Sequence, residues 1–437
     1  MTKRFVLLGL LALVLVAPVT WGQPARHLVL ISIDGLRPEF YLDDAYAAPA
    51  LRALVAAGGH ARAATPPFPS VTYPGHATIV TGVRPARHGI PFNVTWSPTA
   101  GSSGRWYEEA ADLRAPALWD VARAAGLTTA AVSWPVTLGA RIDWLIPERD
   151  YYQRSEPVEL LRRATTPGLL ERLGLAPEPE TFKSVVRWDE FLTAAATGII
   201  KGMRPNLLLV HLVQADYYQH RGGREGADVK PALARVDAHV AAIVSALREA
   251  GIADRTAVIV TGDHGFQDVA RTVHPNEILF RAGLRRCPWS GTSWMATTHD
   301  TGGSSGVFVN DAAGPGIAAQ AEETLRRQAR DRYTIVSRRE LDALGAMPGA
   351  AFGLEAAPGW AFGGGCSENE TAGVRGAHGF LPSRPSMSTG FIASGAGVKS
   401  GVSLERIGLV DVGPTAARLL GLTMTNVEGR VLTEILP

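Results

Sequence analysis

Three apolar runs constrain the fold of this chain more than any other feature of its sequence. They cover residues 27–33, 206–213 and 256–261 and are rich in Leu, Ile and Val, as is typical of strands buried on both faces of a parallel sheet. Segments with helical spacing alternate with them, including residues 48–57, 115–125, 189–203 and 228–250. This alternation predicts an α/β fold with a mostly parallel central sheet and helices on both faces.

Carboxylates and imidazoles gather where these strands end. One follows the first run, two follow the second, two follow the third and one lies in a late glycine-flanked loop: Asp34, Asp216, His220, Asp263, His264 and His378. Ligands collect at the carboxyl ends of strands in open α/β sheets. Each residue alone has an ordinary alternative as a turn Asp or a surface His. Together they predict a site for zinc or a similar first-row metal, with enough ligands for two ions.

A hydroxyl residue precedes a proline in the segment 69–82, where Thr72 is followed by Tyr73 and Pro74. Proline suits the first turn of a helix, so Thr72 is expected at or beside a helix N-terminus, where unpaired N–H groups favour an anion. The alternative is that Thr72 is only an N-cap. Beside two metal ions a hydroxyl can become an alkoxide and attack phosphorus.

The length of 437 residues allows one large α/β domain with insertions or two domains. We place a catalytic domain at 27–437, with insertions at about 135–188 and 285–370. The net charge of +2, without long charge blocks, gives no signal for nucleic-acid binding. Oligomeric state is not readable. Cys287 and Cys366 permit a disulfide in an exported chain, and a bridge between them stays open.

The N-terminus has the pattern of a signal peptide. Lys3 and Arg4 precede an apolar run over residues 5–17, and Pro18 and the residues 20–22 supply a break and a cleavage region. We therefore predict a signal peptide at 1–22 and export, to the periplasm if the source is a Gram-negative bacterium. An uncleaved anchor is the alternative, although the run is short for a membrane span. We expect no stable membrane span after cleavage.

The motifs together resemble the alkaline phosphatase superfamily, and most closely its nucleotide pyrophosphatase/phosphodiesterase (type I phosphodiesterase) family. The similarity covers almost the whole mature chain. It rests on Ile33-Asp34-Gly35, Thr72-Tyr73-Pro74-Gly75-His76, Val80-Thr81-Gly82, His88-Gly89-Ile90, Asp216-Tyr217-Tyr218-Gln219-His220, Thr261-Gly262-Asp263-His264-Gly265, His378-Gly379, Asp411-Val412-Gly413-Pro414-Thr415 and Leu419-Leu420-Gly421-Leu422. The resemblance implies an alkaline-phosphatase-like sheet with inserted cap segments.

The resemblance also implies roles for individual residues. Asp34, Thr72, Asp263 and His264 would hold one zinc ion, and Asp216, His220 and His378 would hold the other. Thr72 would form a covalent phospho-threonine that water then hydrolyses. His76 is expected to be structural.

Two departures from the family bear on substrate choice. Gly75 stands where the phosphodiesterases usually have Asn, and Asn93 is a candidate replacement that contacts a phosphoryl oxygen; the alternative is an ordinary loop amide. Related monoesterases use a Lys-x-Arg pair. Only the arginine of that pair has a counterpart in this chain, which is Arg141. Loss of the lysine leaves a dianionic monoester short of one cation, which favours diesters.

The sequence thus predicts an exported two-zinc hydrolase that cleaves phosphate diesters or nucleotide pyrophosphate bonds in small molecules. A phosphomonoesterase of the same fold and a non-catalytic envelope binding protein are the alternatives. Sulfatase activity is not expected, because the Cys/Ser-x-Pro-x-Arg pattern is missing. Aromatic residues of the less regular segments are candidates for stacking on substrate: Phe92, Trp96, Tyr151, Tyr152 and Tyr217.

Overall fold

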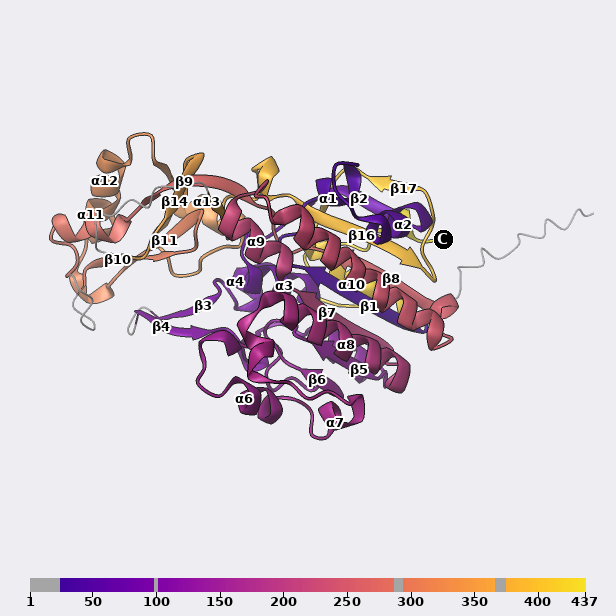
Figure 1. Ribbon diagram of the computed structural model, residues 1–437. Helices are drawn as coiled ribbons and strands as arrows, with labels where there is room; N and C mark the ends of the chain where they lie inside the picture. The colour runs from indigo at the N-terminus through magenta and orange to yellow at the C-terminus, as the bar shows by residue number, and fades with distance from the viewer. Residues whose placement is uncertain (1–23, 98–100, 287–293, 366–374) are drawn as a thin grey trace, which may run out of the picture.

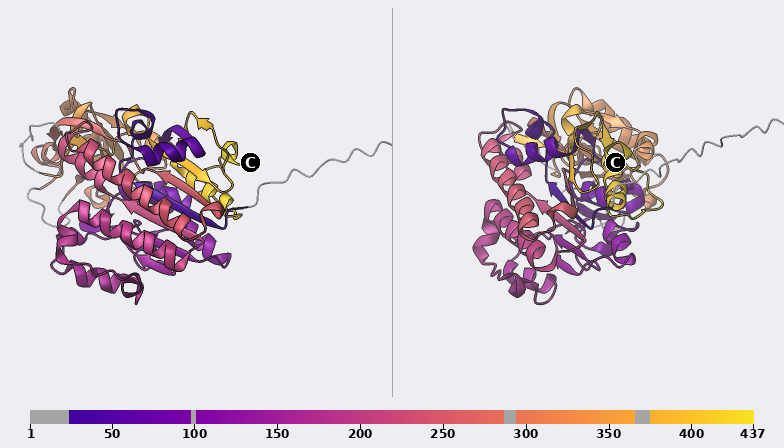
Figure 2. Two further views of the ribbon diagram at one scale, coloured as in Figure 1. Left: turned by 45° about the vertical axis from the view of Figure 1, so that its right-hand side comes forward. Right: turned by 90° about the vertical axis from the view of Figure 1, so that its right-hand side faces the viewer.

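The computed structural model describes residues 24–97, 101–286, 294–365 and 375–437. The predicted signal peptide at 1–22 and both cysteines lie outside these residues. Figure 1 shows a main sheet flanked by helices, and a smaller lobe (orange) at the end of the molecule away from the C-terminus. With the C-terminal end turned toward the viewer, the lobe lies behind the main sheet (Figure 2).

Within the described residues the central sheet has nine strands, in the order β17-β2-β16-β8-β1-β7-β5-β6 with β18 paired to β2. The five from β8 to β6 are parallel, whereas β16 runs antiparallel to β8 and β2. The bounds are β1 His27–Ile33, β2 Gly59–Thr65, β5 Thr129–Val132, β6 Trp144–Ile146, β7 Leu207–Leu212, β8 Thr256–Thr261, β16 Thr389–Gly395, β17 Val402–Leu404 and β18 Ile407–Gly408. The predicted α/β fold with a mostly parallel sheet is confirmed.

Side chains alternate between two cores because successive residues of a strand point to opposite faces. In β1, Val29 and Ile31 belong to one core, whereas Leu28 and Leu30 belong to the other. Helices on the first face are α1 Glu39–Leu42, α2 Pro49–Ala57, α6 Pro157–Ala164, α7 Leu169–Leu173, α8 Val185–Met203, α9 Gln214–Gly222 and α10 Val229–Glu249. Helices on the second face are α3 Thr72–Thr81, α5 Leu118–Ala124 and α14 Val412–Leu419.

The smaller lobe has its own apolar core and two sheets, β10-β11-β13-β12 and β14-β9-β15. Its elements are β9 Gln267–Val273, β10 Ala296–Asp300, β11 Ser304–Val309, β12 Tyr333–Val336, β13 Phe352–Ala356, β14 Gly359–Phe362, β15 Arg375–Ala377, α11 Pro275–Arg281, α12 Ile317–Ala329 and α13 Arg338–Ala343. Helix α4 (Pro85–His88) and the hairpin of β3 (Val94–Ser97) and β4 (Gly101–Trp106) lie between α3 and α5 in the chain.

The segment 135–188 contributes both to the sheet and to the layer over it. It supplies the edge strand β6, and it also contains α6, α7 and the start of α8. Tyr151 packs in this segment against Phe182 and Trp188, with ring centroids 5.5 Å apart in each pair. The tyrosine ring is therefore part of the core and is not available to a substrate.

Candidate active site

Thr72 is the first residue of α3, and its hydroxyl does not cap the helix. The N-cap is Val71, which has an extended backbone, and no side chain caps the helix. The Oγ1 of Thr72 instead lies 3.4 Å from Nε2 of His264. Helix α3 thus presents a half-buried hydroxyl at its N-terminus, beside the strand ends of the central sheet.

The carboxylates that follow β1 and β8 meet at this point. Asp34 Oδ1 and Asp263 Oδ2 each lie 3.3 Å from Nε2 of His264. Asp263 is fixed through its other oxygen, which accepts the backbone N–H of Gly35 at 3.0 Å. Asp34, Asp263 and His264 form one group in which the ligand atoms are mutually close enough to share a metal ion.

A second group adjoins the first. It consists of Asp216, His264 and His378. Asp216 and His220 are four residues apart on one face of α9, and Asp216 Oδ1 lies 3.4 Å from Nε2 of His220. Nε2 of His378 lies 3.0 Å from Nε2 of His220 and 3.7 Å from Asp216 Oδ1. The structure therefore brings together all seven metal-site residues that the sequence predicted.

Backbone carbonyls fix the orientation of the three imidazoles. Nδ1 of His220 contacts the carbonyl of Gly376 at 3.0 Å, Nδ1 of His264 that of Gly265 at 3.2 Å, and Nδ1 of His378 that of Ser70 at 3.1 Å. Because a carbonyl only accepts, each Nδ1 carries a proton, and in the neutral form of each ring Nε2 is the nitrogen that offers a lone pair to the site.

Among the described residues, the site therefore collects more acceptors than donors. Oδ1 of Asp34, Oδ1 of Asp216 and Oδ2 of Asp263 are buried and have no hydrogen-bond partner among the described residues. They lie 3.3 to 4.0 Å from the Nε2 atoms of the three imidazoles. Buried polar atoms are rarely left unpaired. Cations satisfy such a set of oxygen and nitrogen acceptors, so the residues fit a pair of first-row metal ions.

Burial shifts the pKa values of the clustered side chains. It raises the pKa of Asp34 and of Asp263 well above the ordinary range, and the charge of Asp216 adds to the rise in both. The charge of Asp34 adds to the rise for Asp263, whereas a hydrogen bond with Asp263 lowers the pKa of Asp34. Burial also lowers the pKa of His264 and of His378, with further lowering by neighbouring imidazoles. Bound metal ions would favour ionised carboxylates and neutral imidazoles at these positions.

Asn93 lies beside the start of α3. Its Oδ1 accepts the backbone N–H of Tyr73 at 2.9 Å, so the NH₂ half of the amide is the part that can donate to a ligand. His76 contacts Thr72 through a hydrogen bond from Nδ1 to the backbone carbonyl, at 2.8 Å, and is fully buried. That position agrees with a structural role for His76.

Arg141 is not brought to the cluster. It is exposed and precedes β6, at the amino end of a strand parallel to β5, whereas the cluster lies at the carboxyl ends. Tyr217 lies next to Asp216 in α9, is 41% exposed and contacts Arg221 through its hydroxyl at 3.2 Å. Phe92 is buried, and Tyr152 is 49% exposed.

Two residues of the site were missed by the sequence analysis. His211 in β7 lies with Nε2 3.2 Å from Oδ2 of Asp34 and with Nδ1 3.1 Å from the carbonyl of Ser133. Ser70 holds the late loop, because its carbonyl accepts both Nδ1 of His378 at 3.1 Å and the N–H of Gly379 at 2.8 Å. A lone imidazole inside an apolar strand was the available signal for His211.

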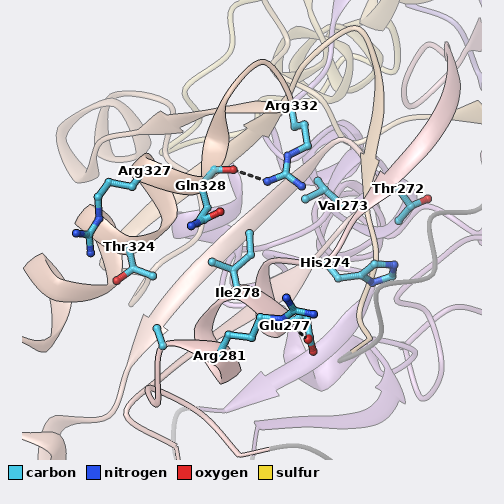
Figure 3. A pocket seen from close by; sticks show the side chains of 11 residues that line it. Thr272, Val273, His274, Glu277, Ile278, Arg281, Thr324, Arg327, Gln328 and Arg332 are labelled. Carbon is cyan, nitrogen blue, oxygen red and sulfur yellow. Dashed lines mark hydrogen bonds and ion pairs between the residues drawn. The ribbon is translucent and has the colours of Figure 1, made fainter.

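A basic hollow of about 650 Å³ lies elsewhere, between β9, α11 and α12 (Figure 3). Arg281, Arg327 and Arg332 line it, and Arg332 donates to the backbone carbonyl of Gln328. None of the clustered carboxylates and imidazoles lines this hollow. The candidate active site is therefore the cluster beside Thr72.

Comparison with known structures identifies close relatives of the fold. Murine ectonucleotide pyrophosphatase/phosphodiesterase 5 has a TM-score of 0.71 at 18% identity, over 94% of this chain and 100% of that chain. Its human counterpart has a TM-score of 0.70 at 20% identity, over 94% and 99% of the two chains. At these identities the likeness shows the fold.

The matches to curated sequences cover a smaller part of each protein than the matches to solved structures do. Human ectonucleotide pyrophosphatase/phosphodiesterase family member 1 is 25% identical over 249 residues, which is 55% of this chain and 23% of the relative. Ectonucleotide pyrophosphatase/phosphodiesterase 1 of Saccharomyces cerevisiae is 23% identical over 279 residues, 57% of this chain and 35% of the relative. The match thus spans about a quarter to a third of the length of these relatives. The model of the type I phosphodiesterase / nucleotide pyrophosphatase family matches residues 28–381, and this chain belongs to that family.

Proposed function

We propose that this chain is an exported two-zinc hydrolase that cleaves phosphate diesters or nucleotide pyrophosphate bonds through Thr72. The observation that carries the proposal is the convergence of three unpartnered carboxylate oxygens and three imidazole nitrogens beside the Thr72 hydroxyl. Membership of the phosphodiesterase family supports the reaction class.

In this proposal Asp34, Asp263 and His264 hold one zinc ion together with Thr72. The second ion is held by three residues: Asp216, His220 and His378. The pair of ions would lower the pKa of a hydroxyl and stabilise the attacking and leaving oxygens of an in-line displacement.

Thr72 would act as the nucleophile. Its Oγ1 would lose its proton to solvent and form a bond to phosphorus while the bond from phosphorus to the leaving oxygen breaks. The leaving oxygen would take up a proton from solvent, which gives an alcohol or a phosphate and a phospho-threonine that still carries the remaining ester group. Water then cleaves the threonine ester and restores the hydroxyl. The unpaired N–H groups at the start of α3 and the NH₂ of Asn93 would donate to the phosphoryl oxygens.

Substrate charge favours a diester in this proposal. Arg141 was the expected partner for the extra charge of a monoester. It lies at the amino ends of the strands, whereas the cluster lies at their carboxyl ends. Murine ectonucleotide pyrophosphatase/phosphodiesterase 5 is known as an inactive threonine-to-alanine variant in complex with AMP. That complex supports a nucleotide as one substrate class here, with Tyr217 on α9 as a candidate contact for the base.

Export is the remaining part of the proposal. The helices among the described residues are all too short or too polar to cross a bilayer. Cleavage after residue 22 would leave the catalytic domain at 27–437, with the insertions at about 135–188 and 285–370, in the periplasm of a Gram-negative source. The mass of the N-terminal peptide of protein recovered from the periplasmic fraction tests this: a peptide that retains residues 5–17 would contradict it.

The hydrolysis of bis-p-nitrophenyl phosphate and of p-nitrophenyl phosphate by purified protein tests the activity. We expect faster cleavage of the diester, together with about two zinc ions per chain by metal analysis. A preference for the monoester would identify a phosphatase instead. Zinc without turnover of either compound would identify a binding protein.

A further inference from the structure

A second hollow of about 400 Å³ lies between the β3–β4 hairpin and the smaller lobe, and it is not part of the metal cluster. Trp96 of β3 and Phe362 of β14 give it aromatic walls, and Thr298 and Asp300 of β10 line it together with Arg285. Its volume falls within the range of small-molecule sites.

The hollow adjoins the candidate active site through two short connections. The ring of His299, which also lines the hollow, lies 4.4 Å from the ring of Phe92, and the next residue is Asn93. On the other side, the turn after Asp300 contacts the late loop, because the N–H of Gly303 donates to the carbonyl of His378 at 2.7 Å. The hollow therefore lies beside segments that also carry Asn93 and His378 of the candidate site.

Asp300 supplies an unused acceptor to this cavity. Its Oδ1 accepts the hydroxyl of Ser305 at 2.5 Å, whereas its Oδ2 is buried without a hydrogen-bond partner among the residues that the structure describes. Thr298, a residue that is only 7% exposed, lies beside this carboxyl and lowers its pKa, and its hydroxyl has no other hydrogen-bond partner among the described residues. A carboxylate accepts hydrogen bonds, so the ligand must bring O–H or N–H donors.

The charges in the cavity point to a neutral ligand. Arg285 contributes a positive charge, and Asp300 contributes a negative one at neutral pH, because burial raises its pKa only to about 6. Burial lowers the pKa of His299 to about 4, which keeps that ring neutral. The carboxylate disfavours an anionic ligand and the guanidinium disfavours a cationic one. Trp96 offers an aromatic face beside these polar groups, at 5.8 Å from the ring of His299.

We propose that this cavity binds a neutral hydroxylated ring, a sugar or a cyclitol, that forms one ester group of the substrate. Hydroxyls of the ring donate to Asp300 Oδ2 and to Thr298, and the apolar face of the ring packs on Trp96. The inference rests on the proposed phosphodiester cleavage and specifies its substrate class.

Two diesters that differ in one ring, which is polyhydroxylated in the first and a plain hydrocarbon in the second, test the inference: glucose 6-(p-nitrophenyl phosphate) and cyclohexylmethyl p-nitrophenyl phosphate. We expect the kcat/KM of the zinc-loaded protein to be at least about tenfold higher for the glucose diester than for the cyclohexylmethyl diester. The reason is that a buried charged acceptor gains its hydrogen bond only with the glucose diester. Asp300→Asn and Thr298→Val should each bring the ratio of the two kcat/KM values towards one. The ratio is the readout because general damage to the site lowers both values together.

Asp342 is an exposed carboxylate of the same lobe. The variant Asp342→Asn is therefore the matched control and should keep the wild-type ratio of the two kcat/KM values. Equal rates for the two diesters in the wild type, or a ratio unchanged in Asp300→Asn, would overturn this inference and leave the proposed hydrolase standing. Failure of the wild type to hydrolyse either diester would overturn the proposed hydrolase itself, and the inference with it.

Discussion

His211 contacts and orients Asp34, one of the proposed metal ligands. It is buried in β7 between the carbonyl of Ser133 and Oδ2 of Asp34, with contacts of 3.1 and 3.2 Å. Residues that hydrogen-bond to a metal ligand and thereby orient it typically increase the metal affinity about 10- to 100-fold. His211 is therefore a positioning residue in this account.

We expect His211→Phe to weaken zinc binding by about 10- to 100-fold, because Asp34 loses its orienting contact. Competition with a zinc chelator measures the affinity. His60→Phe, on β2 and in contact with Ser403, is the control and should bind zinc as the wild type does. Equal zinc affinity in the two variants would contradict the role of His211.

Glu148 should make the stability of the metal-free protein depend on pH. Burial raises its pKa from 4.5 to about 7, and its carboxylate accepts the hydroxyl of Tyr73. Because the folded state binds this proton more tightly than the unfolded state, the free energy of unfolding should fall as the pH rises from 4.5 to 7. Glu148→Gln lacks this titration. The free energy of unfolding of Glu148→Gln minus that of the wild type should therefore be about 3 kcal/mol larger at the upper end of this pH range than at the lower end.

Denaturant unfolding of both chelator-treated proteins at the two ends of this pH range measures the effect. A difference in the free energy of unfolding that stays constant with pH would show that Glu148 does not titrate in this way.

At the scale of single residues, the sequence predicted the candidate metal ligands that the structure brings together, but not the residues that contact and orient them. The ligands could be predicted because they follow apolar strands, or recur four residues apart as Asp216 and His220 do. Arg141 was expected beside the substrate because it is the counterpart of the arginine in the Lys-x-Arg pair of related monoesterases, and a match to one residue of a pair does not show at which end of a strand that residue lies. Ser70 was not predictable, since it acts through its backbone carbonyl.

At the scale of elements, the contact between α3 and the end of β8 sets the position of Thr72. A Cβ on Gly75 would lie 2.9 Å from Cβ of Asp263 and 3.0 Å from its carbonyl oxygen. Close approach of the helix backbone to Asp263 therefore requires glycine at position 75. This packing gives a physical reason for glycine at a position where the resemblance led us to expect Asn.

Gly75→Ala should separate α3 from Asp263, and overpacking of this kind costs about 1–3 kcal/mol in the free energy of unfolding. We also expect loss of diesterase activity, because Thr72 moves with the helix. Gly202→Ala in α8, where an added Cβ meets nothing within 4 Å, is the control and should be neutral or stabilising. A Gly75→Ala protein with unchanged stability and activity would exclude the close packing.

The elements that the sequence predicted are the long ones with clear periodicity. α8 and α10 begin and end within a few residues of the expected bounds, and β1, β7 and β8 do so as well. β2 was not foreseen because Gly59–Thr65 is made of small and polar residues without an apolar pattern. Its antiparallel pairing with β16 joins segments more than 300 residues apart, which no local signal reveals.

At the scale of the whole molecule, metal ions should stabilise the fold as well as the reaction. The cluster joins residues that follow β1, β8 and β15 and residues on α9, so ions bound there link distant parts of the chain. A ligand that binds only the folded state stabilises it by about 2.7 kcal/mol at one hundred times its Kd.

We therefore expect zinc to raise the Tm of the chelator-treated wild type. The rise should be much smaller for Asp263→Asn, which removes a charged ligand from the first metal group. Thermal unfolding with and without zinc measures both proteins. An equal rise in Tm for both would mean that zinc acts elsewhere on the protein.

Covalent capture of Thr72 tests the central claim most directly. Zinc-loaded protein is mixed with bis-p-nitrophenyl phosphate, quenched in acid within one turnover, digested and examined by mass spectrometry. The account predicts that the peptide containing Thr72 carries one p-nitrophenyl phosphoryl group, and that Thr72→Ala shows neither the adduct nor turnover. An adduct on another residue, or hydrolysis that survives in Thr72→Ala, would contradict Thr72 as the nucleophile.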